Sequence, residues 1–297
     1  MQIDKPFIGI LLMIGFCVLA PMGDAMAKVL GGTVSLGMLL LVRFGIQVII
    51  LVPYIFLTGG SFAMPRRAVR LTIQRTILHI IGIGAMFTGL RYLPLADAVA
   101  IAFVMPFIML LLGKTVLGEE VGPHRLAACA VGFVGTLLVV QPNFVDVGWP
   151  ALWPLLVAVV FAMFMLVTRQ VAKEVDPLVL QANSGLIATA ILLPIIVFST
   201  GLEPLEWGIP ATSLAWLLLP LGLLGTLAHL LMTWSLRFAP SATLAPVQYL
   251  EIPIATVIGL AIFGDLPNGW AAVGIVITIC AGLYILMRER AIARAQP

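Results

Sequence analysis

The chain has 297 residues, of which 62% are hydrophobic and only 10% are charged, and its formal net charge is +3. Soluble domains carry about 25% charged residues, so a water-soluble fold could not cover this much apolar surface. The basic residues are scattered and form no stripe beside stacking aromatic residues, so no nucleic-acid partner is indicated. We therefore predict an all-α integral membrane protein whose solvent is the lipid bilayer.

Apolar runs divide the chain into ten predicted transmembrane helices. Each run has the roughly 17–25 residues that a helix needs to cross a bilayer core of about 30 Å. The runs are separated by glycine and proline residues, which are typical of turns. In chain order the predicted spans are 7–29, 35–57, 72–91, 95–117, 124–141, 150–172, 178–200, 212–236, 241–263 and 269–287.

The distribution of lysine and arginine predicts how these spans are oriented, because positively charged loops tend to remain in the cytoplasm. With the N-terminus inside, most of the 16 Lys and Arg residues, Arg75 among them, fall on the cytoplasmic side. Lys28 and Arg91 fall outside, and Arg43 lies within a span. We therefore predict that both termini are cytoplasmic. Four tryptophans beside the opposite loops are typical of an outer aromatic belt, namely Trp149, Trp153, Trp207 and Trp270.

The chain resembles itself at a shift of 146 residues. In this register Leu90–Pro94 aligns with Leu236–Pro240 without a gap, and Gly118-Glu119 aligns with Gly264-Asp265. Each half holds five predicted spans, and because this number is odd, the second half enters the membrane from the opposite side. Many secondary transporters build alternating access on such inverted-topology repeats. The predicted repeats cover residues 1–145 and 146–297.

An Arg-x-x-Pro motif, a proline-bearing helix and a Gly-Glu or Gly-Asp pair recur once in each half. This pattern resembles the drug/metabolite transporter superfamily, in particular its ten-helix EamA-type members, and among them the amino-acid exporters of the YddG type. The motif residues are Pro94, Pro106, Gly118 and Glu119 in the first half and Pro240, Glu251, Pro253, Gly264 and Asp265 in the second.

The resemblance implies a secondary transporter of the bacterial inner membrane that exports small metabolites, chiefly amino acids, by alternating access through a central cavity. It implies no cofactor. Cationic drugs are alternative substrates, and a lipid flippase or an intramembrane enzyme on a similar frame are alternatives of another class. The spans contain no nucleophile elbow, zinc-ligand set or aspartate dyad, so the sequence predicts neither an enzyme nor a metal site.

Ionisable residues inside the spans are the first candidates for a solute site. Each costs about 2.5–3.5 kcal/mol to insert and normally faces a cavity or a partner. Glu251 is the main candidate, because a helix that begins near Ser241 places it about 15 Å deep, close to the bilayer midplane. It could hold the amino group of a substrate, take up a proton, or be a neutral acid bonded to a neighbouring helix. Gln248 and Tyr249 are further cavity candidates, because they precede the break expected at Pro253.

Two further pairs of residues lie at matching depths. Asp24 and Arg43 in the first two spans are close enough in depth to form an ion pair, which either ties two helices together or faces the ligand. His79 and His229 both lie about seven residues from the inner face. Each histidine either bonds to a neighbouring helix or lines the cavity.

Pro106 and Pro253 interrupt corresponding helices of the two halves, because proline removes a backbone hydrogen bond and kinks a helix. Matching interruptions indicate the central site of a transporter, the alternative being passive kinks. Small residues recur every four positions in the last span of each half, which favours close helix contact. These two spans either pack against each other or join two copies in a homodimer. The small residues are Ala128, Gly132, Gly274, Thr278 and Gly282.

Overall fold

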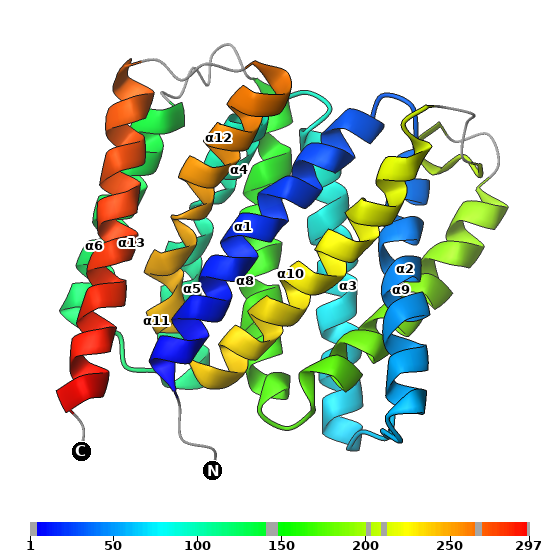
Figure 1. Ribbon diagram of the computed structural model, residues 1–297, viewed down its shortest axis with the longest axis horizontal. Helices are drawn as coiled ribbons and strands as arrows, with labels where there is room; N and C mark the ends of the chain where they lie inside the picture. The colour runs from blue at the N-terminus through cyan, green and yellow to red at the C-terminus, as the bar shows by residue number, and fades with distance from the viewer. Residues whose placement is uncertain (1–4, 141–147, 200–202, 209–212, 265–268, 296–297) are drawn as a thin grey trace.

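The computed structural model describes residues 5–140, 148–199, 203–208, 213–264 and 269–295. Within these ranges every regular element is a helix (Figure 1). Eight helical segments are long and apolar enough to cross a membrane, and two shorter apolar helices stand beside them. The prediction of an all-α membrane protein with ten helical spans is confirmed for the part of the chain that is described.

The first half contains four unbroken helices and one broken span. Its elements are α1 (Pro6–Leu30), α2 (Leu36–Leu57), α3 (Arg66–Gly89), α4 (Leu95–Ala102), α5 (Met105–Leu117) and α6 (Pro123–Val140). The second half repeats this order. Its elements are α8 (Leu152–Ala172), α9 (Pro177–Phe198), α10 (Leu218–Phe238), α11 (Ser241–Gln248), α12 (Glu251–Phe263) and α13 (Gly269–Ala295), with short 3-10 turns η1 (Trp149–Ala151), η2 (Glu203–Leu205) and η3 (Ala215–Leu217).

The predicted span boundaries agree with the helices except near the membrane surface. Helix α3 begins at Arg66, six residues before the predicted span at 72, because a helix can continue into the polar interface where lipid no longer demands apolar side chains. Both α5 and α12 end on a left-handed glycine, Gly118 with φ 65° and Gly264 with φ 74°. Glycine adopts this conformation without a steric penalty and so ends a helix cleanly.

The two broken spans are the most regular feature of the repeat. The bounds of α4 and α5 lie 146 residues before those of α11 and α12, which is the shift found in the sequence. The interruptions fall at Phe103 and Tyr249, ahead of Pro106 and Pro253 in the first turn of the following helix. Proline clashes with the carbonyl four residues before it and cannot bond to it, so it breaks the helix on its N-terminal side. The expected interruptions are therefore present in both halves.

Both termini lie at one end of the molecule, which we call the termini side, and the opposite end is called the far side (Figure 1). Helix α1 runs from the termini side to the far side, whereas α8 begins at the far side and runs back. The corresponding helices of the two halves therefore run in opposite directions, as an inverted repeat requires.

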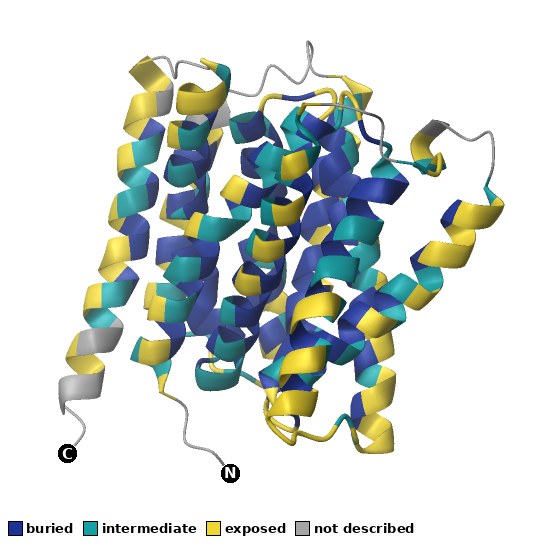
Figure 2. Cartoon of the chain, turned by 45° about the vertical axis from the view of Figure 1, so that its right-hand side comes forward, coloured by how far each residue is buried: buried dark blue, intermediate teal, exposed yellow. Residues whose placement is uncertain are grey.

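The helices pack into a bundle whose buried residues lie at its centre and whose exposed apolar residues lie on its outer surface (Figure 2). Helices α6 and α13 pair at one edge of the bundle, and α2 and α9 pair at the other (Figure 1). The centre is formed by α1, α3, α8 and α10, together with the broken spans.

The small residues of α6 and α13 allow close helix contacts within the chain. A Cβ on Gly135 of α6 would lie 2.9 Å from the Gly274 carbonyl oxygen and from Thr278 Cγ2 of α13. A Cβ on Gly132 would meet the Tyr249 ring at 2.6 Å, and one on Gly282 would meet Leu250 at 2.7 Å. These glycines let the two helices approach each other and the break between α11 and α12. A homodimer through the same faces stays a prediction, and it would need contacts beyond these glycines.

Candidate functional site

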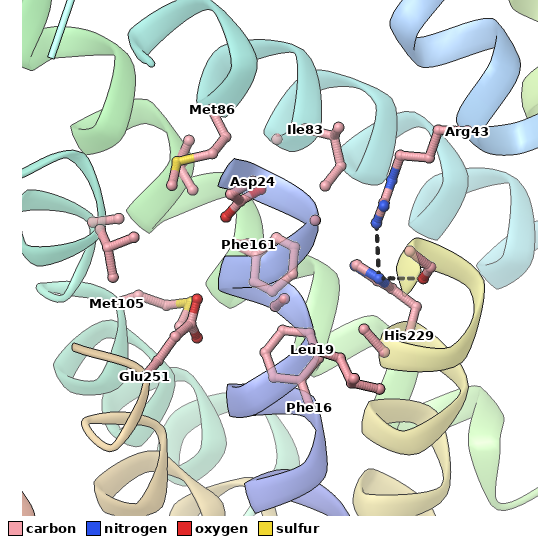
Figure 3. Close-up of a pocket in the computed structure, with 18 of the residues that line it drawn as sticks. Phe16, Leu19, Asp24, Arg43, Ile83, Met86, Met105, Phe161, His229 and Glu251 are labelled. Carbon is pink, nitrogen blue, oxygen red and sulfur yellow. Dashed lines mark hydrogen bonds between the residues drawn. The ribbon is translucent and has the colours of Figure 1, made fainter. Parts of the chain in front are cut away.

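A cavity lies at the centre of the bundle (Figure 3). Residues of α1, α3, α4, α8 and α10 form most of its wall, and Met105 and Glu251, which open α5 and α12, form the rest with Arg43 of α2. Helix α1 contributes residues from Phe16, which is near its midpoint, to Asp24, which lies towards Leu30. The cavity therefore extends from mid-depth into the far half of the membrane.

The cavity wall is apolar apart from a few groups. Asp24, Arg43, His229 and Glu251 supply its charged and titratable groups. The apolar side chains include Phe16, Leu19, Ile83, Met86, Met105 and Phe161. A cavity of this kind can hold a solute that carries charged groups at one end and an apolar or aromatic body at the other.

Glu251 is the first residue of α12, and its carboxylate is directed into the cavity (Figure 3). Helix α11 supplies the eight residues before the break, so Glu251 stands about 12–15 Å inside the helical span. It is 8% exposed, and its carboxylate makes no hydrogen bond or ion pair within the described part of the chain. This geometry favours a group that meets a solute over one that is bonded to a neighbouring helix.

Arg43 contacts His229 rather than Asp24. Its Nη2 donates to His229 Nδ1 at 2.9 Å. His229 Nδ1 also lies 3.1 Å from the carbonyl oxygen of Gly225. The guanidinium reaches α10 because Gly225 has no side chain, and a Cβ there would overlap it.

The expected Asp24–Arg43 ion pair is absent from the described residues, although both side chains line the cavity. The two groups therefore face a common space. Asp24 and Arg43 interact electrostatically without a direct contact among the described residues, and the ligand-facing pair stays a prediction.

His79 lies behind the cavity wall. Its ring centre is 4.3 Å from that of His229, 4.6 Å from Phe164 and 5.1 Å from Phe44. The ring is 1% exposed, and neither nitrogen has a partner in the described part of the chain. Of the two histidines, only His229 reaches the cavity.

Gln248 and Tyr249 are fully buried and do not line the cavity. The break turns them towards the first half of the bundle: Gln248 Nε2 donates to Met109 Sδ at 3.6 Å, and Tyr249 Oη donates to the Phe103 carbonyl at 3.4 Å. The expectation that both face the cavity is therefore corrected. Phe103 and Tyr249 are equivalent in the 146-residue register, so the two breaks contact each other at the middle of the repeat.

The Gly-Glu motif forms a clamp on the termini side. Glu119 accepts hydrogen bonds from the Ser241 and Ala242 amides, at 3.2 and 3.1 Å, and from Ser241 Oγ at 2.6 Å. It also pairs with Arg169 Nε at 3.3 Å, and Arg169 Nη1 donates to the Leu236 carbonyl at 2.6 Å. The pair thus joins the end of α10 to the start of α11. Its sequence counterpart Asp265 lies outside the described residues.

Sequence reasoning missed Arg75 as a buried residue, because the charge count assigned it to the basic cytoplasmic side. It is fully buried in α3. Its position inside the predicted span 72–91 was the available signal, since a charge within a span normally has a partner or a function.

Ten helical spans in two oppositely directed halves, with a broken helix in each half beside a central cavity, define a membrane transporter of the repeat type. The chain belongs to the EamA-like transporter family, whose family model matches residues 7–141 and 148–288.

Curated relatives carry transporter names. A "Riboflavin transporter" of Rhizobium johnstonii is 29% identical over 73% of this chain and 70% of its own length. An "S-adenosylmethionine uptake transporter" of Rickettsia prowazekii is 24% identical over 92% of this chain and 90% of its own. A solved crystal structure shares the fold, with a TM-score of 0.72 at 19% identity over 97% of this chain and 98% of that one. Family and names indicate a transporter rather than an enzyme.

Proposed function

We propose that the protein is a secondary transporter that carries amino-acid-type metabolites through the central cavity by alternating access. The observation that carries this proposal is the placement of Glu251 at mid-depth, facing a cavity that Asp24 and Arg43 also line. A carboxylate can hold the ammonium group of an amino acid, and the guanidinium can hold its carboxylate with two parallel hydrogen bonds. The phenylalanine and methionine side chains would receive the apolar part.

The charge balance of the cavity favours one kind of amino-acid derivative. Asp24 and Glu251 provide two acidic groups against the single guanidinium of Arg43. A solute with an amino-acid group and one further positive charge balances them, and S-adenosylmethionine has this composition through its sulfonium. The names of the Rickettsia relatives point to the same solute.

A flavin is the second candidate. The Phe16 and Phe161 rings in the cavity wall lie 6.4 Å apart at an interplanar angle of 22°, an apolar surface suited to a flat ring system. The riboflavin transporters among the relatives favour this solute. A flavin carries no ammonium group, so its transport would depend little on the charge of Glu251.

We further propose a bacterial inner-membrane location with the termini side in the cytoplasm. The basic residues Arg66, Arg67 and Arg70 in the first turns of α3 support this orientation. The Rickettsia relatives are named for uptake, whereas the family resemblance of the sequence implied export. Alternating access is reversible, so the gradients of solute and coupling ion set the direction of net transport.

Transport into proteoliposomes tests the proposal with labelled S-adenosylmethionine, phenylalanine and riboflavin as the panel. Glu251→Gln keeps the shape of the side chain and removes its charge, and we expect it to slow transport of the amino-acid solutes by about ten-fold or more, because a charge-assisted hydrogen bond is lost. Glu120→Gln is the matched control, since Glu120 is exposed at the end of the span. If Glu251→Gln retains the parent rate for every transported amino-acid solute, the ionic role is wrong. Transport of riboflavin alone, unaffected by Glu251→Gln, would support the flavin instead.

A further inference from the structure

Arg75 links α3 to three helices of the second half. It stands nine residues after the start of α3 at Arg66, and its side chain is 0% exposed. The Phe164 ring covers the guanidinium at 4.8 Å. The guanidinium donates to Thr168 Oγ1 of α8 at 2.9 Å, to Ser184 Oγ and Gln181 Oε1 of α9 at 2.6 and 2.8 Å, and to Thr233 Oγ1 of α10 at 3.3 Å.

The acceptors around Arg75 are held in place by their own hydrogen bonds. Thr168 donates its proton to the Phe164 carbonyl and Thr233 donates to the His229 carbonyl, both at 2.6 Å, so their lone pairs remain for the guanidinium. Gln181 Nε2 is tied to Gln47 Oε1 of α2 at 3.1 Å. All the acceptors are neutral, and no carboxylate pairs with Arg75 in the described part of the chain. The cluster is a site built for a guanidinium between helices.

This cluster lies on the termini side of the cavity, and its five side chains are fully buried. Phe164 stacks between Arg75 and the cavity wall, with its ring centre 5.0 Å from that of Phe161 and 6.0 Å from that of His229. The Glu119–Arg169 clamp lies nearer still to the termini side, because Glu119 follows the end of α5 and Arg169 is in the last turn of α8. A solute leaving the cavity in that direction would have to pass the Phe164 layer and then the helices that Arg75 holds together.

The inverted order of the helices relates Arg75 to Arg43. Helices α2 and α3 of the first half correspond to α9 and α10 of the second. Arg43 bridges α2 to α10 at the cavity wall, and Arg75 bridges α3 to α9 in a cluster of fully buried side chains. In an inverted repeat, the opposite conformation arises when each half adopts the arrangement that the other half has now. The contact between α3 and α9 would then open, and the contact between α2 and α10 would close.

We propose that Arg75 is the gate residue of the termini side, a positioning residue whose hydrogen bonds hold α3 against α8, α9 and α10 until that side opens. The gate rests on the proposed function, since it presupposes alternating access. Removing the guanidinium leaves Ser184 Oγ and Gln181 Oε1 without a donor beside an unfilled space in the closed form. In the open form water replaces the donor, so the substitution shifts the population towards the open termini side.

Two cysteine reporters on α8 measure this shift. Ala172→Cys probes the closed side, one turn beyond Thr168, and Val157→Cys probes the cavity; Ala172 is 0% and Val157 8% exposed. Each is placed in a background in which the three native cysteines are replaced by alanine. Protein in lipid nanodiscs, where both sides meet solvent, is reacted with a polar maleimide. We expect Arg75→Gln to raise the labelling rate at position 172 by about ten-fold and to lower the rate at position 157.

The controls separate a gate from general loosening. Arg70→Gln changes an exposed arginine of the same helix and should leave both rates unchanged. Ser184→Ala removes a single acceptor and serves if Arg75→Gln does not fold, and it should shift both rates in the same directions by a smaller factor. Arg75→Lys should restore part of the parent rates. Equal changes at both reporters, no change, or slower labelling at position 172 would overturn the gate. The labelling needs no solute, so its result is independent of whether the transport assay supports the proposed function.

Discussion

The absence of a side chain at Gly225 allows Arg43 to reach His229, so Gly225→Ala is a sharp test of this part of the cavity wall. A Cβ at this position would overlap the guanidinium and lie 2.5 Å from its Cζ. Arg43 must then leave His229 Nδ1 and move into the adjoining cavity, which has room for it. The lost hydrogen bond to a charged group is worth about 1.5–3 kcal/mol. Alanine in place of glycine stabilises the helix by about 1 kcal/mol through its higher helix propensity.

The balance predicts a net destabilisation of about 0.5–2 kcal/mol, or a melting temperature lowered by a few degrees in detergent. Gly23→Ala is the matched control, because Gly23 also lines the cavity and a Cβ there meets nothing within 4 Å. It should melt at or above the parent temperature. In an Arg43→Ala background, Gly225→Ala should become stabilising, since only the helix-propensity gain remains. A Gly225→Ala protein that melts at or above the parent would refute the contact between Arg43 and α10.

Two further predictions concern the termini side. Glu119→Gln should lower the free energy of unfolding by about 1–3 kcal/mol, because it weakens both the Arg169 ion pair and the hydrogen bonds at the start of α11. Glu120→Gln at the exposed neighbouring position should be neutral in the same thermal melt. Ser61, between α2 and α3, and Glu206, after η2, lie at opposite ends of the bundle. A single cysteine at position 206 should label in intact cells, and one at position 61 only after permeabilisation. Labelling of both in intact cells would contradict the cytoplasmic termini.

The span pattern and the breaks could be read from the sequence because they have local causes. The lipid core requires an apolar run of about fixed length wherever the chain crosses it, so each span can be recognised from its own residues alone. Pro106 and Pro253 break their helices by a steric effect on the preceding turn, and the 146-residue shift reappears in the helix bounds. Glu251 was singled out by its depth alone, and depth follows from counting residues along a helix.

Tertiary structure decided which side chains the cavity receives. Nearly every face of these helices is apolar, so composition does not fix how a helix is rotated about its axis, and only packing against neighbours does so. Because Gly225 has no side chain, Arg43 has the space to contact His229. The break at Tyr249 turns Gln248 and Tyr249 away from the cavity. Arg75 was counted with the cytoplasmic charges, yet four polar side chains from α8, α9 and α10 enclose it. Those acceptors lie 93 to 158 residues away in the sequence, so only the folded bundle brings them together.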